Sequence, residues 1–237
     1  MKKKQVQRLV AFSLATMMTL QGLSVNASGQ VQVRTDSNTQ MSSDKEVVYV
    51  NTYDTSKRVH DFDANWKFYL GDADGAEAVN FDDSAWRTVS VPHDYSIEQE
   101  YTQSGEAESG YLPGGTGWYR KHFTLTEDMK DKEIRLDFGG VYMNATVWVN
   151  GTQLGTHPYG YTPFSFDITD YVKAGEENVI TVKVDHQTPS SRWYSGSGIY
   201  RSVDLTVMDK VHVDLNGTKI ATPNLAKEKD KTNIMLM

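Results

Sequence analysis

Cysteine is absent from this 237-residue chain. A protein without cysteine has no disulfides, no thiol nucleophile, no thiolate zinc site and no covalent haem attachment. Its stability must therefore come from buried side chains. A composition of 38% hydrophobic and 11% aromatic residues provides enough of them for one domain or slightly more. Binding or catalysis is left to carboxylates, histidine, arginine, hydroxyls and aromatic rings.

The chain also lacks a clean apolar run long enough to span a bilayer. Its longest apolar stretch, LVAFSLATMMTLQGLSV, follows the basic start MKKKQVQR and is interrupted by Ser13, Thr16, Thr19 and Gln21. Small residues come next, up to Ala27. This pattern predicts a secretory signal peptide over residues 1–27, rather than a membrane anchor, and a secreted or cell-surface protein with no membrane span in its mature form.

Basic residues are fewer than acidic ones, with 24 Lys and Arg against 31 Asp and Glu. Loss of residues 1–27, which contain four basic residues and no acid, would change the net charge from −7 to −11. Such a surface repels phosphate backbones and anionic lipids. Nucleic acid and anionic membranes are therefore not expected as partners.

Sustained helical periodicity is missing as well. Residues 28–46 are rich in Ser, Gln, Asn, Thr and Asp, which predicts a flexible lead-in. From residue 47 to 208, short alternating segments such as ATVWV and NVITVKV are separated by Gly, Asn, Asp and Pro. This texture predicts an antiparallel all-β sandwich or barrel, and Asn150-Gly151 predicts a type I′ hairpin turn.

No known catalytic motif is recognisable. The acidic groups Asp82-Asp83, Glu106–Glu108 and Glu176-Glu177 lie in turn-like sequence and are interpreted as solvated loop charge. The six histidines lack metal-ligand spacing, and neither Gly-x-Ser-x-Gly nor a phosphate loop occurs in context. We therefore expect no catalytic residue, no metal and no cofactor.

Aromatic residues remain in surplus, with five tryptophans and thirteen tyrosines, many beside Arg, Asp, Asn and His. Rings that stack on sugar faces, next to planar donors and carboxylates, are suited to carbohydrate recognition. The alternative for Trp66, Trp86 and Trp148 is that these rings build the core.

Four motifs occur in one order: FDDSAWRTVSVPHDYSIE, GGTGWYRKHFTL, DFGGVYMNATVWVNGTQLGTHPYGYTPFSFDIT and SRWYSGSGIYRSV. From about Asp61 to Val207 the chain resembles the amino-terminal sugar-binding domain of glycoside hydrolase family 2, most closely its bacterial β-galactosidase branch. The resemblance implies a galactose-binding-like jelly-roll sandwich, then an immunoglobulin-like domain, then a barrel with both catalytic glutamates. Residues 209–237 are then a linker and the truncated start of the immunoglobulin-like domain.

The resemblance also implies a sugar-contacting rim in which Arg192 donates to vicinal hydroxyls beside Trp193, with Asp94 and His93 as further candidates. The alternative is that Arg192 and Asp94 form ion pairs within or between domains. The predicted role is to complete the substrate pocket of a β-galactosidase-type enzyme, without hydrolysis by this chain alone. A freestanding carbohydrate-binding module and a purely structural sandwich are the rival hypotheses.

Overall fold

The structure is a computed structural model that describes residues 23–25, 31–33, 57–190, 192–193, 195–221 and 233–236. The chain divides into two compact units, residues 1–51 and 52–237. In the first unit, β1 (Leu23–Val25) pairs with β2 (Val31–Val33). The predicted signal peptide and lead-in otherwise lie outside the described residues, so both stay predictions.

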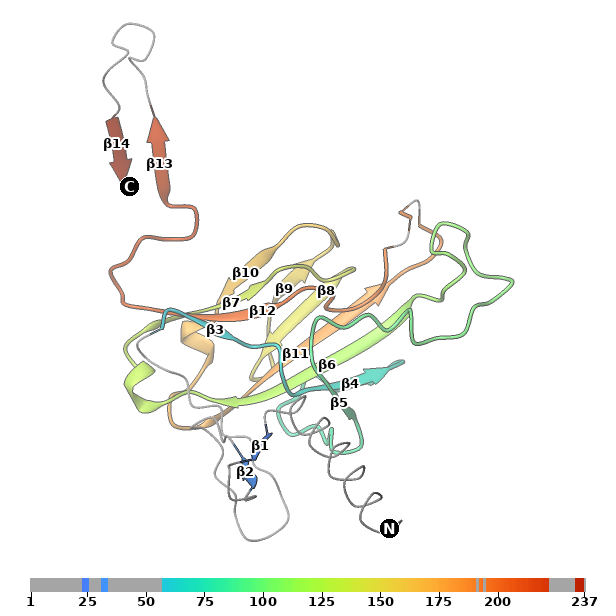
Figure 1. Ribbon diagram of the computed structural model, residues 1–237, viewed down its shortest axis with the longest axis horizontal. Coiled ribbons are helices and arrows are strands. Elements are labelled where there is room, and N and C mark those ends of the chain that lie inside the picture. The colour runs from blue at the N-terminus through green and yellow to red at the C-terminus, as the bar shows by residue number, and fades with distance from the viewer. Residues whose placement is uncertain are drawn as a thin grey trace, which may run out of the picture. The chain divides into compact units, whose positions relative to one another are not determined.

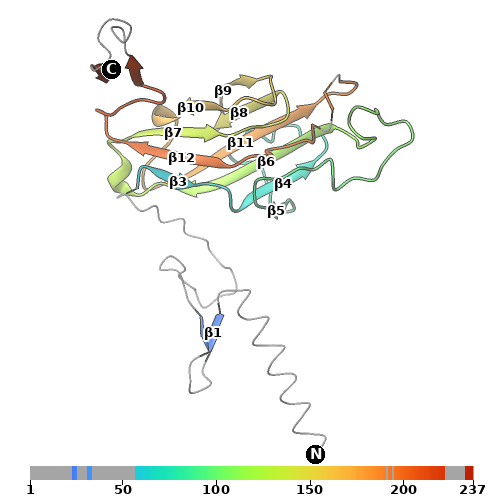
Figure 2. The same cartoon turned by 45° about the horizontal axis from the view of Figure 1, so that its top comes forward.

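Residues 59–208 of the second unit form two antiparallel sheets, which lie one over the other as a sandwich (Figures 1 and 2). One sheet has the order β10-β7-β12-β3, formed by Phe164–Asp167, Glu133–Phe138, Val203–Met208 and Val59–Asp61. The other has the order β5-β4-β6-β11-β8-β9, formed by Arg87–Val89, Trp66–Leu70, Gly115–Thr124, Glu177–His186, Ala145–Val149 and Thr152–His157. Besides strands, the described part contains two short 3-10 turns, η1 (Glu127–Met129) and η2 (Thr169–Tyr171), and no α-helix. The all-β sandwich is thus confirmed.

Strand alternation explains where the core sits. On β11, Ile180, Val182 and Val184 are completely buried, as their position on one face of the sequence pattern predicts. They join one large hydrophobic cluster that draws on both sheets, and each such side chain contributes about 1.5–3 kcal/mol by leaving water. The predicted hairpin turn is also confirmed, because Asn150 and Gly151 have φ values of 48° and 79° between β8 and β9.

The loop from residue 71 to 86 covers part of the outer face of the six-stranded sheet. It forms a second cluster in which Ala73, Ala76 and Trp86 pack with Trp118 of β6. The core interpretation is right for Trp66, which is 0% exposed, and for Trp86, which is 8% exposed. Trp148 is only half-buried.

One sequence-based interpretation is wrong here. Asp83 is not a solvated loop carboxylate: it is buried, and its Oδ2 accepts hydrogen bonds from Arg120 Nε at 2.8 Å and pairs with His122 Nε2 at 2.9 Å. Burial works against the charged form, but these partners outweigh it and lower the Asp83 pKa. Arg120 lies 37 residues downstream, so no local pattern marks the pair.

After β12 the described chain continues to β13 (Thr218–Ala221), which pairs with β14 (Asn233–Leu236). The predicted linker and immunoglobulin-like start over residues 209–237 are described only in part and stay predictions. No helix in the described ranges is long and apolar enough to cross a membrane.

Candidate functional site

The predicted site residues lie on two segments that the fold brings side by side. The loop between β5 and β6 and the segment between β11 and β12 lie at the same end of the sandwich (Figures 1 and 2). Two backbone hydrogen bonds join them, from His93 N to Ile199 O at 2.7 Å and from Tyr95 N to Ser197 O at 2.9 Å. His93 and Asp94 are thereby fixed against the segment that carries Arg192 and Trp193.

Asp94 fastens the two segments together. Its Oδ1 accepts hydrogen bonds from the backbone N–H groups of Ser96 at 2.9 Å and Ser197 at 2.8 Å. Gly196, with φ of 68°, packs so closely that an added Cβ would lie 2.4 Å from Asp94 Oδ2. In this structure the Asp94 carboxylate therefore supports the loop: Oδ1 binds two backbone N–H groups and Oδ2 lies against Gly196.

A buried hydrogen-bonded chain lies beneath this clamp. Ser96 donates its only hydroxyl proton to the carbonyl oxygen of Pro113 at 2.9 Å, so its Oγ accepts from the Ser197 hydroxyl. Ser197 Oγ in turn accepts from His186 Nδ1. Burial lowers the His186 pKa and so favours the neutral imidazole. Because Ser197 donates its own proton to Ser96, the bond to Ser197 assigns the imidazole proton to Nδ1. Every donor in this series of hydrogen bonds has an acceptor, which fixes the loop.

His93 lies mostly inside the protein, with 9% of its side chain exposed. Its Nδ1 is 2.7 Å from the Tyr119 hydroxyl, and its Nε2 is 3.2 Å from Glu98 Oε1. Burial lowers the His93 pKa, although Glu98 acts in the opposite direction. The ring also packs edge-on to Phe68, with centroids 4.6 Å apart.

Arg192 and Trp193 are the two exposed members of the predicted set. Trp193 has 59% of its surface exposed, and the backbone N–H of Arg192 donates to Ser190 Oγ at 3.1 Å. Both side chains are thus presented outward from a segment whose far end, at residues 196–199, is fixed by Asp94 and His93.

Tyrosines outside the predicted set lie around this rim. The rings of Tyr142 and Tyr161 lie 5.4 Å apart, and those of Tyr159 and Tyr161 lie 5.6 Å apart. Burial raises the Tyr161 pKa, while the nearby positive charge of Arg192 opposes that rise. Tyr159 is 48% exposed. The run PYGY at residues 158–161, with two tyrosines around a glycine, was the signal that could have located them.

Two buried oxygen atoms at this end have no hydrogen-bond partner in the described part of the chain: Glu106 Oε2 and Ser195 Oγ. The other Glu106 oxygen accepts the backbone N–H of Ser190. The interpretation of Glu106 as solvated loop charge is therefore wrong. It is a half-buried carboxylate that holds the segment just before Arg192.

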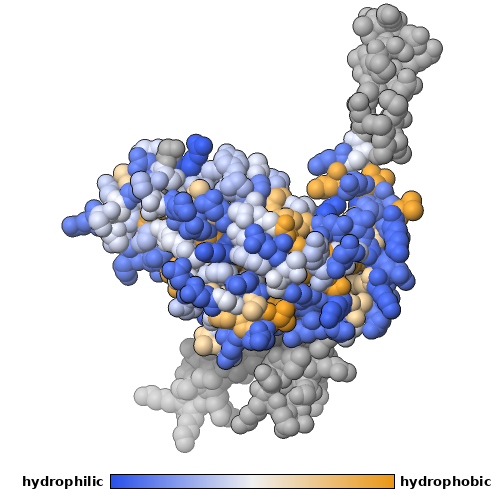
Figure 3. Space-filling view, turned by 180° about the vertical axis from the view of Figure 1, so that it is seen from behind, coloured by the Kyte–Doolittle hydropathy of each residue, from blue (hydrophilic) through white to orange (hydrophobic). Residues whose placement is uncertain are grey.

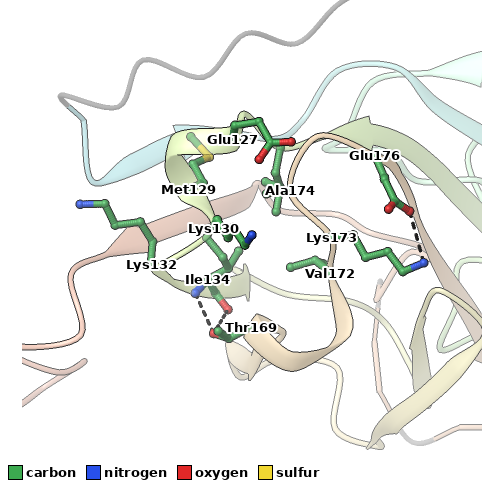
Figure 4. A pocket seen from close by; sticks show the side chains of 11 residues that line it. Glu127, Met129, Lys130, Lys132, Ile134, Thr169, Val172, Lys173, Ala174 and Glu176 are labelled. Carbon is green, nitrogen blue, oxygen red and sulfur yellow. Dashed lines mark hydrogen bonds and ion pairs between the residues drawn. The ribbon is translucent and has the colours of Figure 1, made fainter.

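Elsewhere the surface is mostly hydrophilic, with hydrophobic residues in small groups, as the reverse face in Figure 3 shows. A hollow of about 350 Å³ lies between η1 and η2, beyond the far end of β6 from the loops. There Lys173 pairs with Glu176 at 3.2 Å, and Thr169 Oγ1 accepts the Ile134 N–H at 2.9 Å (Figure 4). It contains none of the four predicted residues. Nor do three His, Asp or Glu side chains gather as a metal-ligand group anywhere in the described ranges.

Comparison with known proteins decides the family. The profile described as "Glycosyl hydrolases family 2, sugar binding domain" matches residues 59–209, more than half of the chain. The chain belongs to glycoside hydrolase family 2. The match confirms the resemblance seen in the four ordered motifs. The matched residues include both sheets of the sandwich.

Relatives support this assignment. The β-galactosidase BoGH2A of Bacteroides ovatus is 44% identical over 177 residues, which are 73% of this chain and 21% of that protein. A putative β-glucuronidase of Formosa agariphila is 42% identical over 176 residues, 73% of this chain and 17% of that protein. This family 2 chain thus spans about a fifth of the length of the curated relatives it matches.

Solved structures agree. A family 2 member from Bacteroides cellulosilyticus aligns with a TM-score of 0.68 and 44% identity over 70% of this chain and 23% of that one. The β-glucuronidase of Bacteroides uniformis aligns with a TM-score of 0.62 and 32% identity over 70% and 20% of the two chains.

Gly198 of this family 2 domain offers a test of the loop clamp. It has φ of 120°, and an added Cβ would lie 2.4 Å from the Tyr119 hydroxyl and 2.7 Å from the His93 carbonyl oxygen. Gly198→Ala is expected to lower the unfolding free energy by about 2 kcal/mol more than Gly115→Ala, measured by urea denaturation. Gly115 is the matched control, because its φ is 108° but nothing lies within 4 Å of its Cβ position. Equal losses would show that the backbone angle alone matters.

Proposed function

We propose that the sandwich completes the substrate pocket of a secreted family 2 glycoside hydrolase that acts on β-galactosides. Support comes from the family assignment and from relatives named as β-galactosidases. The observation that carries the proposal is that Arg192 and Trp193 are exposed on a segment anchored through Asp94. Secretion rests on the signal-peptide pattern of residues 1–27 alone.

The chemistry of the rim suits a sugar. The planar Arg192 guanidinium can donate two parallel hydrogen bonds to vicinal hydroxyls, and the exposed rings of Trp193 and Tyr159 offer apolar faces to pyranose C–H groups. Asp94 and His93 act in this proposal by positioning the segment, because their polar atoms face Ser96, Ser197, Tyr119 and Glu98. Hydrolysis needs two carboxylates flanking the glycosidic bond. We assign that pair to the barrel implied by the family resemblance.

A domain exchange tests the proposal. Residues 57–209 of this chain would replace the matching domain of the β-galactosidase BoGH2A, its 44% identical relative. In this chimaera, Arg192→Ala and Trp193→Ala are each expected to lower kcat/KM for a nitrophenyl β-galactoside by about tenfold or more. Lys130→Ala, at the opposite end beside η1, is the control and should leave kcat/KM unchanged. An active chimaera that is indifferent to both rim substitutions would refute the proposal.

A freestanding carbohydrate-binding module is the second candidate, because Trp193 and Tyr159 are 59% and 48% exposed. Titration calorimetry of the protein with galactose and lactose, together with a galactoside hydrolysis assay, separates the two. Binding heat that disappears in Trp193→Ala, without hydrolysis, would favour the module. Absence of both heat and hydrolysis would fit a domain that acts only with its barrel, or a purely structural sandwich.

A further inference from the structure

A groove of about 510 Å³ lies on the outer face of the six-stranded sheet, away from the residues of the proposed rim. One wall comes from the loop after β4 and includes Asp74 and Glu77; the other comes from β9 and includes Gln153. Trp118, Trp148 and Lys183 from β6, β8 and β11 line it between those walls. These strands are neighbours in the sheet (Figure 1).

The sheet register assembles this surface. Lys183 is paired with Trp118 on β6, and Gln153 is paired with Trp148 on the other side. Inward-facing residues alternate with these positions: Tyr119, Val147 and Val184 are all completely buried in the main core. The groove residues consequently project from the opposite face of the same strands.

Two tryptophans provide an aromatic platform. The rings of Trp118 and Trp148 are stacked, with centroids 5.8 Å apart and planes inclined by 23°. Lys183 Nζ lies 5.5 Å from the centroid of Trp118. Trp118 is 94% buried beneath the loop, whereas Trp148 keeps part of its ring in the groove.

One buried polar atom beside the groove lacks a hydrogen-bond partner among the described residues. The indole N–H of Trp118 is buried and has no hydrogen-bond partner in the part of the chain that the structure describes, which costs about 1–3 kcal/mol unless something accepts the bond. Asp74 and Gln153 are exposed and Glu77 is half-buried. Packing of the loop accounts for the burial of Trp118 but not for its unsatisfied N–H or for the polar side chains gathered around the groove.

We propose that this groove is an auxiliary binding site for a neutral oligosaccharide of about two or three pyranose units, as its volume allows. A sugar ring offers apolar C–H faces to Trp148 and hydroxyls that both donate and accept. Carboxylates of Asp74 and Glu77 accept hydroxyl protons, while the side chains of Lys183 and Gln153 donate. Two carboxylates against one ammonium make the groove unsuited to an anionic ligand. The site does not depend on the proposed function, because it uses neither Arg192 nor Trp193.

The test is titration of the protein with β-1,4-galactotriose, cellotriose and xylotriose, followed by calorimetry and tryptophan fluorescence. At least one trisaccharide is expected to bind. Trp148→Ala should weaken its affinity by about tenfold or more, and Gln153→Ala by about threefold. Gln153 is exposed, so its substitution keeps the test valid if Trp148→Ala fails to fold.

Lys130→Ala, beside η1 and outside the groove, is the control and should leave this affinity unchanged. Trp193→Ala is tested alongside it to report any sugar bound at the loop rim. Absence of binding by all three trisaccharides would overturn the proposal. Binding that survives both groove substitutions, or that only Trp193→Ala abolishes, would overturn it equally. The second of those outcomes would instead place the sugar at the rim, so failure here is distinguishable from failure of the proposed function.

Discussion

Replacement of Arg120 by methionine is expected to lower the free energy of unfolding by about 3–5 kcal/mol, because it leaves the buried Asp83 carboxylate without its arginine partner. Arg120 lies on β6 and is completely buried. Its Nε donates to Asp83 at 2.8 Å. Its Nη1 donates to the Ala78 carbonyl oxygen and to Thr181 Oγ1, both at 3.0 Å, and also to the Ala76 carbonyl oxygen.

One guanidinium thus holds the loop of residues 71–86 against the sheet. Methionine preserves the apolar stem and the strand but removes all these donors, so Asp83 keeps only His122 and the loop carbonyl oxygens lose theirs. The same loop forms one wall of the outer groove. Arg120→Met should therefore also weaken trisaccharide binding, if the groove is the site.

Arg87→Met is the control for the loss of an arginine as such. Arg87 pairs with Glu98, but the two side chains are 49% and 41% exposed, so water competes for both and the pair contributes at most about 1 kcal/mol. Urea denaturation of the two variants should separate them clearly. A loss at Arg120 no larger than the loss at Arg87 would show that the loop does not depend on the buried pair.

Much of the fold could be predicted from the sequence. Alternation on β8 and β11 predicted an antiparallel sandwich or barrel, and the Asn150-Gly151 turn predicted the hairpin between β8 and β9. The family resemblance of the four ordered motifs implied the jelly-roll sandwich. Such patterns do not predict hydrogen bonds between residues that lie far apart in the sequence. Asp83 looks like any loop carboxylate until Arg120 is folded over it, and Asp94 looks like a free acceptor until the Ser197 N–H reaches it from 103 residues away.

In the candidate site, too, some residues could be predicted from the sequence and others depend on the folded structure. Residue type and motif pointed to Arg192 and Trp193, and the structure places both at the surface. The outer groove depends instead on strand register and loop closure, because it combines side chains from β6, β8, β9 and β11 with the loop after β4. No single stretch of sequence contains that information.

Lys121 is the neighbour of Arg120 on the opposite face of β6. Its replacement by methionine is expected to raise the free energy of unfolding, whereas Arg120→Met lowers it. Lys121 is 2% exposed. Its Nζ donates to the Ala64 carbonyl oxygen and lies 4.3 Å from the ring centroid of Phe62, but no carboxylate lies within ion-pair distance of it in the described residues. Burial lowers the Lys121 pKa from 10.5 to about 8, against the weaker pull of Asp61 and Asp63.

A lowered lysine pKa means that the folded state holds its proton less tightly than the unfolded state does. Between about pH 8 and pH 10 the unfolded chain binds more protons at this site, so the wild-type stability rises with pH in that window. Below pH 8 the buried charge costs up to about 3 kcal/mol. Lys121→Met removes that cost together with the pH dependence.

We therefore expect Lys121→Met to raise the unfolding free energy at pH 7 by about 1–3 kcal/mol, because removal of the buried charge outweighs the loss of its contacts with Phe62 and Ala64. Urea denaturation at pH 7, 8 and 9.5 measures the difference from the wild type, which should shrink as pH rises. Readings above pH 10 are avoided because burial raises the pKa values of Tyr95 and Tyr119. A variant that is less stable at pH 7, with a difference independent of pH, would mean that the ammonium stabilises the core through Phe62 and Ala64. Both buried cations of β6, Lys121 as well as Arg120, would then stabilise the fold.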